Sequence, residues 1–257
     1  MYPVLLKIGN FSLYTYGLFI AVSFIVGIIV ARHEAGRLEE DQDKIMDLCF
    51  YVLLAAIVGS RLFYVLTNLE MFVSDPLEIL RIWNCGLVFY GGFIAALITA
   101  IIYLKKKKML LFKTADIMAP PLAIGHAIGR MGCFFAGCCY GNACDLPWAV
   151  IFTNPDSLAP VNIAVHPTQL YSFVANLLIF IFLWFFRKRK RYDGQLFWIY
   201  VFLYGVSRFL IEIFRGDFRG DFLFEVLSIS QVIGAFMALI SVIMLILFRR
   251  RELKAKD

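Results

Sequence analysis

Long apolar stretches and short polar segments alternate along this chain. The apolar stretches are seven in number and cover 12–31, 45–66, 87–104, 115–135, 168–186, 195–214 and 226–248. A helix needs about 20 apolar residues to cross the ~30 Å hydrocarbon core of a bilayer, and these stretches approach that length. Lipid offers no hydrogen-bond partners, so each stretch must satisfy its backbone groups internally. The pattern therefore predicts an all-α, polytopic membrane bundle of seven transmembrane helices.

Composition agrees with this prediction and narrows the function. The chain is 61% hydrophobic and 17% charged, whereas soluble domains are about half apolar and about a quarter charged. The net charge of +6 lies in short clusters between the apolar stretches and does not indicate nucleic-acid binding. The sequence shows no internal repeat and no soluble segment, so we predict one integral membrane domain over 1–257. The first stretch lacks a basic leader and a cleavage site, so we expect it to remain as a helix.

The basic residues predict an orientation. Lys and Arg concentrate in the loops after the first, third and fifth stretches and in the C-terminal tail. The opposite side carries only Lys7, Arg81, Arg215 and Arg219. Because cytoplasmic loops carry the excess of Lys and Arg, we predict an outer N-terminus and a cytoplasmic C-terminus. The longest outer segment, about 136–167, is then an extracytoplasmic loop.

Arg130 lies inside the glycine-rich apolar segment 126–141. An ionisable side chain at membrane depth is costly, so it usually faces a protein interior or a wet cavity and marks function. The predicted topology places Arg61 and Arg208 in the same outer half of the membrane, with few acids nearby. The planar guanidinium suits phosphate, and the phosphate at this depth is that of a phospholipid headgroup. The pattern favours an enzyme or carrier that grips a phospholipid of the outer leaflet.

Each of these residues also has a purely structural interpretation. Arg61 lies near a helix end, from which a side chain can snorkel to the interface. Arg208 and Glu212 are spaced i, i+4 and form an ordinary helical ion pair in that interpretation. His126, one turn before Arg130, is also typical of a hydrogen-bonded packing residue. The tyrosines at the same depth fit an interfacial aromatic belt.

Four cysteines, at 133, 138, 139 and 144, are spaced C-x4-C-C-x4-C near the predicted outer face. Disulfides persist on that face, and small buried thiols are the other structural interpretation. A metal site is disfavoured because the spacing is not C-x2-C. The cluster supports an alternative function, a quinone-linked membrane thiol–disulfide oxidoreductase, which leaves the arginines unexplained. A lipid or ion permease is a further alternative, without the repeat that such folds carry.

Six motifs are spread along nearly the whole chain. They are Tyr16-Gly17, Gly59-Ser-Arg61-Leu-Phe-Tyr64, Trp83-Asn-Cys-Gly86, Gly129-Arg130 with Gly132, Phe134 and Gly141, His166-Pro-Thr-Gln169-Leu-Tyr171, and Tyr204-Gly205 with Arg208, Glu212 and Arg215. Together they resemble the prolipoprotein diacylglyceryl transferase family of bacteria. The chain departs from the family signature at four positions. Cys133 and Ala136 stand where that signature has asparagines, Cys138 stands where it has a glutamate, and Tyr90 stands where many members carry a histidine.

The resemblance implies transfer of the diacylglyceryl group of phosphatidylglycerol to the lipobox cysteine thiol of a prolipoprotein, with release of glycerol phosphate. It implies the bacterial cytoplasmic (inner) membrane, an active site toward the outer leaflet, and no metal or organic cofactor; we expect a monomer. We assign catalysis to Arg208, Tyr90 and His126, and substrate binding to Arg130, Tyr16, Arg61, Gly141, Tyr204, Glu212, His166 and Gln169. A paralogue with another acceptor stays open as an alternative.

The group that takes the thiol proton also stays open. A tyrosine such as Tyr90, with an ordinary pKa of about 10, is a poor base at neutral pH. An imidazole titrates near 6.5, so His126 is a candidate substitute. An arginine-rich field that lowers the pKa of the acceptor thiol is the other possibility.

Overall fold

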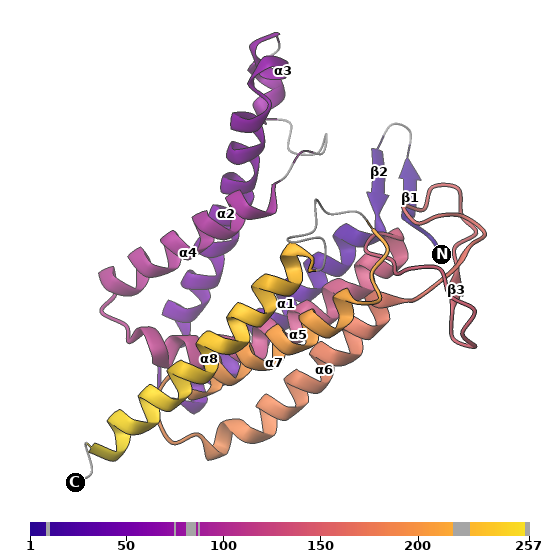
Figure 1. Ribbon diagram of the computed structural model, residues 1–257. Coiled ribbons are helices and arrows are strands. Elements are labelled where there is room, and N and C mark those ends of the chain that lie inside the picture. Colours follow the sequence, from indigo (N-terminus) through magenta and orange to yellow (C-terminus); the bar gives the residue numbers. More distant parts are fainter. Residues whose placement is uncertain (9–10, 75, 81–85, 87, 218–226, 255–257) are drawn as a thin grey trace. The chain divides into compact units, whose positions relative to one another are not determined.

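Helices dominate the computed structural model (Figure 1), which describes residues 1–257 except 9–10, 75, 81–85, 87, 218–226 and 255–257. The helices are α1 Thr15–Arg37, α2 Gln42–Thr67, α3 Leu69–Ser74, α4 Phe89–Lys106, α5 Leu111–Ala136, α6 Thr168–Phe186, α7 Gln195–Glu212 and α8 Ile229–Lys254, with the 3-10 helices η1 Pro76–Leu80 and η2 Arg187–Arg189. The strands are β1 Val4–Ile8, β2 Phe11–Tyr14, β3 Val150–Ile151 and β4 Ala164–Val165, and they form two antiparallel pairs, β1–β2 and β3–β4. The first helix begins at Thr15 rather than at the predicted 12, because Phe11–Tyr14 pairs with β1.

Within the described residues, five helices are long and apolar enough to cross a membrane, namely α1, α2, α4, α6 extended by η2, and α8. The prediction of a multi-pass helical membrane protein is therefore confirmed. The two other long helices, α5 and α7, have 26 and 18 residues and cover the remaining predicted stretches. Helix α5 carries His126 and Arg130, and α7 carries Arg208 and Glu212. These ionisable residues of the predicted site lower the mean hydropathy of both helices. The count of seven spans stays a prediction.

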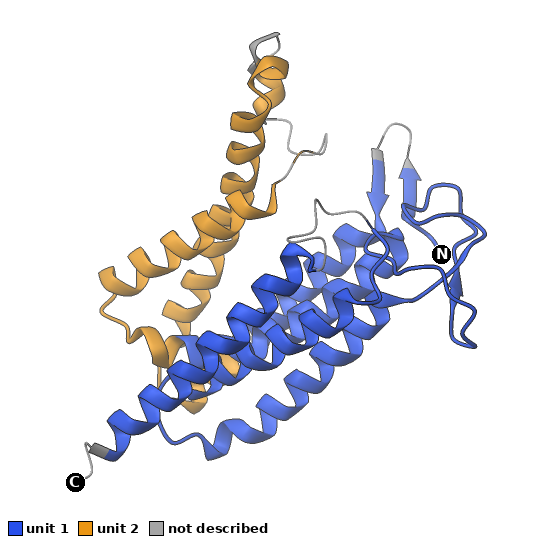
Figure 2. Ribbon diagram, in the orientation of Figure 1, with its two compact units in different colours: residues 1–30, 115–257 blue, residues 31–114 orange. Residues whose placement is uncertain are grey.

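The chain divides into two compact units (Figure 2), unit 1 with residues 1–30 and 115–257 and unit 2 with residues 31–114. Helices α1 and α5 contribute residues to both units. We describe each unit by itself, and the single-domain assignment stays a prediction.

Unit 2 is built on the packing of α2 against α4. Small residues allow this: a Cβ on Gly59 would lie 2.7 Å from the carbonyl oxygen of Gly91, and one on Gly92 would lie 2.8 Å from that of Ala56. Such contacts are how membrane helices gain van der Waals energy in the absence of a hydrophobic driving force. The N-terminus of α2 is capped by Asp41, whose Oδ1 accepts the backbone N–H groups of Asp43 and Lys44 at 3.0 and 3.2 Å.

The core of unit 1 joins α5, α6 and α7. Its buried residues are Ala119, Ala123, Ile179, Leu183, Leu196, Tyr200 and Val201. Helix α8 packs on α7, where a Cβ on Gly205 would lie 2.7 Å from the carbonyl oxygen of Gly234. These close contacts fix the helices that carry the candidate site.

Asp116 connects α5 to the start of α7. Its carboxylate, 1% exposed, accepts the backbone N–H groups of Gly194 and Phe197 at 2.8 and 2.9 Å and pairs with the Lys190 ammonium at 3.0 Å. A carboxylate at a helix N-terminus satisfies orphan donors and complements the helix dipole. Asp116 therefore sets the position of α7 relative to α5.

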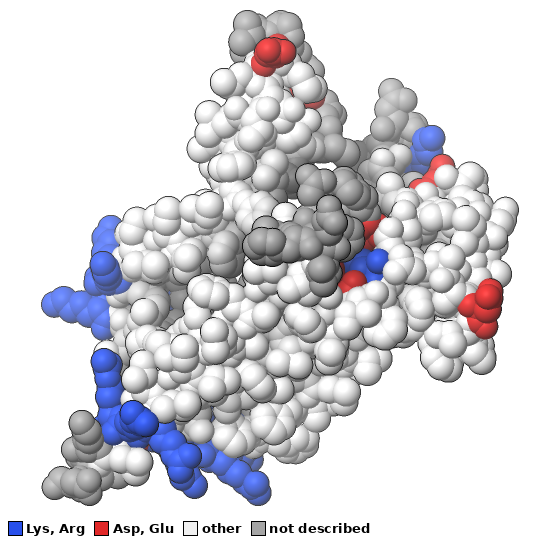
Figure 3. Space-filling model, viewed as in Figure 1, with Lys and Arg blue, Asp and Glu red and all other residues white. Residues whose placement is uncertain are grey.

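The basic segments 187–191 and 249–251 lie at one end of unit 1. They are brought together by Tyr192, whose ring stacks on Phe248 at 6.4 Å and whose hydroxyl donates to the Leu245 carbonyl at 3.1 Å. Figure 3 shows Lys and Arg gathered over the end of α8 that leads to the C-terminus. Unit 1 thus carries a strongly basic end.

Candidate active site

All the predicted site residues except Arg61 and Tyr90 belong to unit 1. Arg130 lies in α5, six residues before the helix ends at Ala136. Its guanidinium is half-buried and interacts electrostatically with Tyr204, Cys139 and Cys133. It forms no hydrogen bond or ion pair with any residue that the structure describes. A partly desolvated positive charge without a counter-ion suits an anion that arrives from outside the protein.

A network of charged groups occupies the end of α7. Arg208 Nη1 lies 2.6 Å from Glu212 Oε2, and Arg208 Nη2 donates to Ser230 Oγ of α8 at 2.9 Å. Arg215 Nη1 lies 3.8 Å from the same Glu212 oxygen. The predicted Arg208–Glu212 ion pair is therefore present, but Glu212 is shared by two arginines. Glu212 thus holds both guanidinium groups in place.

Arg215 is the strongest addition to the predicted site. Its guanidinium binds both carboxylate oxygens of Asp217. Burial alone lowers the pKa of Arg215, but the Asp217 carboxylate raises it above its ordinary value, so the guanidinium stays charged. Arg215 also interacts electrostatically with Arg130. The apolar pattern placed Arg215 in a loop, because it follows directly after an apolar stretch. Its spacing of three residues from Glu212 could have predicted an ion pair between the two.

His126 lies one helical turn before Arg130 and packs against aromatic rings of α7. Its ring stacks on Tyr204 with centroids 5.1 Å apart, and its Nδ1 lies 3.3 Å from the Tyr200 hydroxyl. Tyr204 in turn interacts electrostatically with both Arg130 and Arg208. His126 therefore has the contacts of a packing residue together with a position beside the arginines, and its role as a base stays a prediction.

Gly141 joins the loop after α5 to the end of α7. Its N–H donates to the His166 carbonyl at 2.9 Å, and it pairs with Arg215 in an antiparallel bridge. A Cβ at this position would lie 2.5 Å from the His166 Cβ and 2.6 Å from the Phe214 carbonyl oxygen. Only glycine fits, so Gly141 brings the loop and Arg215 together by close backbone approach.

The segment 166–171 holds this loop in place. Gln169, 0% exposed, donates from Nε2 to the Cys138 carbonyl at 2.8 Å. Thr168, which the sequence did not single out, donates from Oγ1 to the Cys139 carbonyl at 2.6 Å. His166 Nδ1 lies 3.1 Å from the Tyr171 hydroxyl. These contacts give Gln169 and His166 a positioning function, and their direct contact with substrate stays a prediction.

Tyr16 lies in the first turn of α1, on the α5 side of unit 1. A Cβ on Gly132 would lie 3.3 Å from Tyr16 Cδ2, so the two helices approach closely here. Tyr16 interacts electrostatically with Arg130 and with Cys133, Cys138 and Cys139. Tyr16 thus lies among the predicted site residues, near Arg130 and the clustered cysteines.

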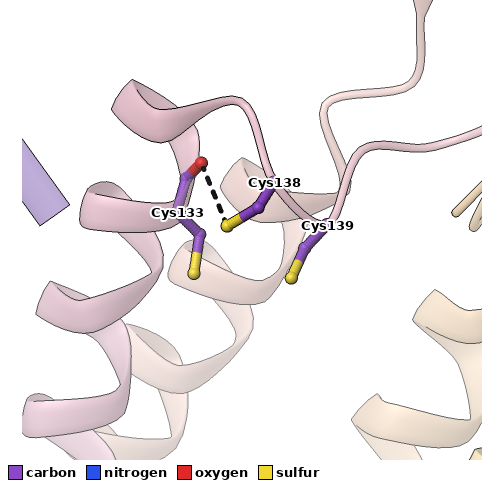
Figure 4. A group of neighbouring side chains, drawn as sticks. All are labelled: Cys133, Cys138 and Cys139. Carbon is purple, nitrogen blue, oxygen red and sulfur yellow. Dashed lines mark hydrogen bonds between the residues drawn. The ribbon is translucent and has the colours of Figure 1, made fainter. Parts of the chain in front are cut away.

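Three of the four clustered cysteines converge (Figure 4). The sulfur atoms of Cys133, Cys138 and Cys139 all lie within 4.8 Å of one another, and the Cys138 thiol donates to the Cys133 carbonyl at 3.8 Å. Cys144 is outside this group. The described cysteines form no disulfide, so the interpretation of the cluster as a disulfide staple finds no support.

Arg61 and Tyr90 belong to unit 2. Arg61 is 5% exposed and donates to the carbonyl oxygens of Glu78, Ile79 and Gly86 at 2.5, 3.0 and 3.3 Å. Its side chain is held inside unit 2 rather than extended toward an interface. Tyr90, in the first turn of α4, is 58% exposed. The motif residues 83–85, together with Arg81 and Arg219, lie outside the described residues.

The fold and the site define a multi-pass helical membrane protein. A half-buried arginine, which has no ion-pair partner among the described residues, lies beside an arginine–glutamate network. Comparison with known proteins agrees with the resemblance found in the sequence motifs. A model of the prolipoprotein diacylglyceryl transferase family matches residues 3–247. The chain belongs to this family.

Similar proteins span nearly the full length of the chain. A phosphatidylglycerol–prolipoprotein diacylglyceryl transferase from Clostridium tetani is 36% identical over 253 residues, which are 98% of this chain and 100% of that protein. Proteins of the same name from Geobacter sulfurreducens and Finegoldia magna are each 33% identical over 255 residues. They cover 97% and 99% of this chain, and 96% and 98% of their own lengths. These relatives favour the transferase over the oxidoreductase and the permease.

Proposed function

We propose that this protein transfers the diacylglyceryl group of phosphatidylglycerol to the lipobox cysteine thiol of a prolipoprotein, forming a thioether and releasing glycerol phosphate. The observation that carries the proposal is the full-length similarity to transferases of that name. Arg130, which has no ion-pair partner in the part of the chain that the structure describes, lies beside the Arg208–Glu212–Arg215 network. This arrangement supports the proposal, since the reaction needs cations where a phosphate leaves.

We further propose seven membrane spans in the bacterial cytoplasmic membrane, with the N-terminus outside, the C-terminus in the cytoplasm and the monomer as the active form. The basic end of unit 1, made by 187–191 and 249–251, supports this orientation because cytoplasmic ends carry the excess of Lys and Arg. Arg130 and Glu212 lie toward the opposite ends of α5 and α7. The active site then opens toward the outer leaflet.

The bond changes are simple. The acceptor sulfur attacks the glyceryl carbon that carries the phosphate ester, so that a C–S bond forms and the C–O bond breaks. The electron pair of the broken bond leaves with the glycerol phosphate oxygen, and the thiol proton passes to a base or to solvent. The step balances without an oxidant or a reductant. Only the thiolate is an effective nucleophile, and a free thiol with a pKa of about 8.5 needs modest activation.

The arginines act on the phosphate. Arg130 has no ion pair to lose with any described residue, whereas Arg208 is held by Glu212 and Ser230 at fixed geometry. Preorganised donors aimed at a growing negative charge lower the barrier because they need no rearrangement during the step. Tyr16 and Tyr204 are placed to bind further lipid oxygens. We propose His126 as a group that takes the thiol proton. Tyr90 and Arg61 belong to unit 2, and their roles in catalysis and substrate binding stay predictions.

The test is a two-substrate assay with the purified full chain in phosphatidylglycerol vesicles. A peptide with a lipobox cysteine should gain a diacylglyceryl thioether, and glycerol phosphate should appear in equal amount. A matched peptide with serine in place of the cysteine should give neither product. Release of glycerol phosphate with the serine peptide, or with no peptide, would contradict the proposal and favour a paralogue with another acceptor. In cells, the protein should restore prolipoprotein processing to a strain depleted of its own transferase.

A further inference from the structure

The three converging cysteines form a compact sulfur cluster that the proposed reaction does not use. Cys133 lies in the last turn of α5, and Cys138 and Cys139 follow after the chain reverses at Gly137, which has φ of +78°. Cys139 itself has φ of +63°, a left-handed conformation that a non-glycine residue seldom adopts. All three sulfurs lie within 4.8 Å of one another, and Figure 4 shows them side by side.

The cluster is held by the rest of unit 1. Thr168 and Gln169 at the buried start of α6 bind the carbonyl groups of Cys139 and Cys138 at 2.6 and 2.8 Å. The third cysteine is fixed by the helix that carries it. A set of ligands whose backbone is already ordered binds an ion without a large entropic penalty.

We propose that Cys133, Cys138 and Cys139 together bind one thiophilic d10 cation, of which Zn²⁺ is the common biological example. Zinc–sulfur bonds are about 2.3 Å long, so three sulfurs around one ion lie about 4 Å apart. The observed spacing of no more than 4.8 Å needs only small side-chain rotations to reach that value. Thiolates select such ions over Mg²⁺ and Ca²⁺, which prefer oxygen ligands.

The charges around the cluster favour a loaded site. Three thiolates on one divalent ion carry one net negative charge, and both Arg130 and Arg215 interact electrostatically with Cys139. The arginines therefore stabilise the anionic metal complex. Three protein ligands leave one coordination position for water or another small ligand, as in zinc sites that are not closed by a fourth side chain.

The number of thiols also favours an ion over a disulfide. One disulfide would use two of the three sulfurs and leave the third beside it, whereas one ion uses all three. The linear spacing C-x4-C-C argued against a metal, but the reversal at Gly137 brings the ligands together in space. The sequence-based expectation of no metal is thus revised by this proposal, which does not depend on the transferase activity.

Cadmium is a suitable probe, because its thiolate complexes absorb in the ultraviolet. The full chain, reduced and treated with chelator in detergent, is titrated with Cd²⁺. We expect one equivalent to bind with a thiolate-to-metal charge-transfer band, and a large excess of Zn²⁺ to weaken the apparent binding of Cd²⁺ by competition. The variants C133S, C138S and C139S should each bind Cd²⁺ at least about tenfold more weakly, and the triple variant should give no band. C144S, whose sulfur lies outside the cluster, is the matched control and should titrate like the unchanged chain.

Helix content and elution volume establish that each variant is folded before it is titrated, and any single variant that folds is sufficient for the test. X-ray absorption of the zinc-loaded chain should show three sulfur neighbours at about 2.3 Å. The proposal is overturned by a band that survives the triple substitution, by a band that is lost with C144S, or by a shell without sulfur. It is also overturned by a disulfide within the trio in cells alkylated before lysis.

Discussion

Arg130 offers the sharpest test of the site, because its substitution by glutamine should greatly reduce activity and leave stability nearly unchanged. Among the described residues Arg130 has no ion-pair or hydrogen-bond partner, so its removal breaks no such contact with them. Its charge interacts favourably with Tyr204, Cys139 and Cys133 and unfavourably with Arg215, and these effects oppose one another. We therefore expect the free energy of unfolding to change by no more than about 1 kcal/mol.

The same substitution should greatly reduce transfer. Loss of one preorganised donor to a growing negative charge lowers kcat by about 10²–10³, which corresponds to about 3–4 kcal/mol. R208Q is the matched comparison, since it breaks the 2.6 Å contact with Glu212 and the bond to Ser230. That variant should lose activity and also stability, by about 1–3 kcal/mol.

Thioether formation on the lipobox peptide measures the activity of both variants, and thermal unfolding in detergent measures their stability. The reasoning fails if R130Q retains more than about a third of the unchanged activity, well short of the expected loss. It also fails if R130Q unfolds as readily as R208Q, because Arg130 would then have a structural partner within the protein.

Three further outcomes follow from the packing and the caps. G205A should destabilise the protein by about 1–3 kcal/mol, because its Cβ would lie 2.7 Å from a carbonyl oxygen of α8; G17A, whose Cβ meets nothing within 4 Å, should leave the midpoint of thermal unfolding unchanged or raised. D116N should cost about 1–3 kcal/mol, because the amide accepts the N–H groups of Gly194 and Phe197 less strongly and Lys190 keeps only its partner Asp193; K190M should recover part of that loss in a double-mutant cycle. The hydrogen bond from the Lys44 backbone to Asp41 lowers the pKa of the Asp41 carboxyl below 3.8. The stabilisation of α2 by this cap is therefore fully present above pH 3.8 and is lost as the pH falls through the lowered value. The unfolding midpoint of D41N should depend less on pH in this acid range than that of the unchanged protein, and equal acid dependence in both proteins would contradict the assignment.

Local patterns predicted most of the helical structure. The stretch 45–66 lies within α2 at Gln42–Thr67, and 168–186 coincides with α6 at Thr168–Phe186. Helix positions follow from runs of apolar residues because a membrane span needs a fixed length of them. The Arg208–Glu212 pair was equally accessible, since residues four apart on a helix are neighbours whatever the tertiary structure.

Contacts between distant segments could not be predicted in this way. The apolar pattern did not reveal that β1 pairs with the neighbouring β2 and delays the first helix to Thr15, because hydropathy alone does not separate a short strand from the start of a helix. The bonds from Asp116 to Gly194 and Phe197 connect residues 78 and 81 positions apart. Such contacts are decided by how helices pack, and a periodic pattern carries no information about which polar atom meets which.

The sequence by itself determined that this chain is a membrane helix bundle, which side is basic, and that Arg130 is an exceptional charge in an apolar segment. Each of these follows from composition and spacing along one helix. Only the tertiary structure decided that Arg130 has no counter-ion among the described residues, that Glu212 is shared with Arg215, and that Cys133, Cys138 and Cys139 meet while Cys144 does not. The meeting of the three cysteines depends on the reversal at Gly137 and on the anchors in α6, because the distance between two side chains across a turn is set by the folded backbone.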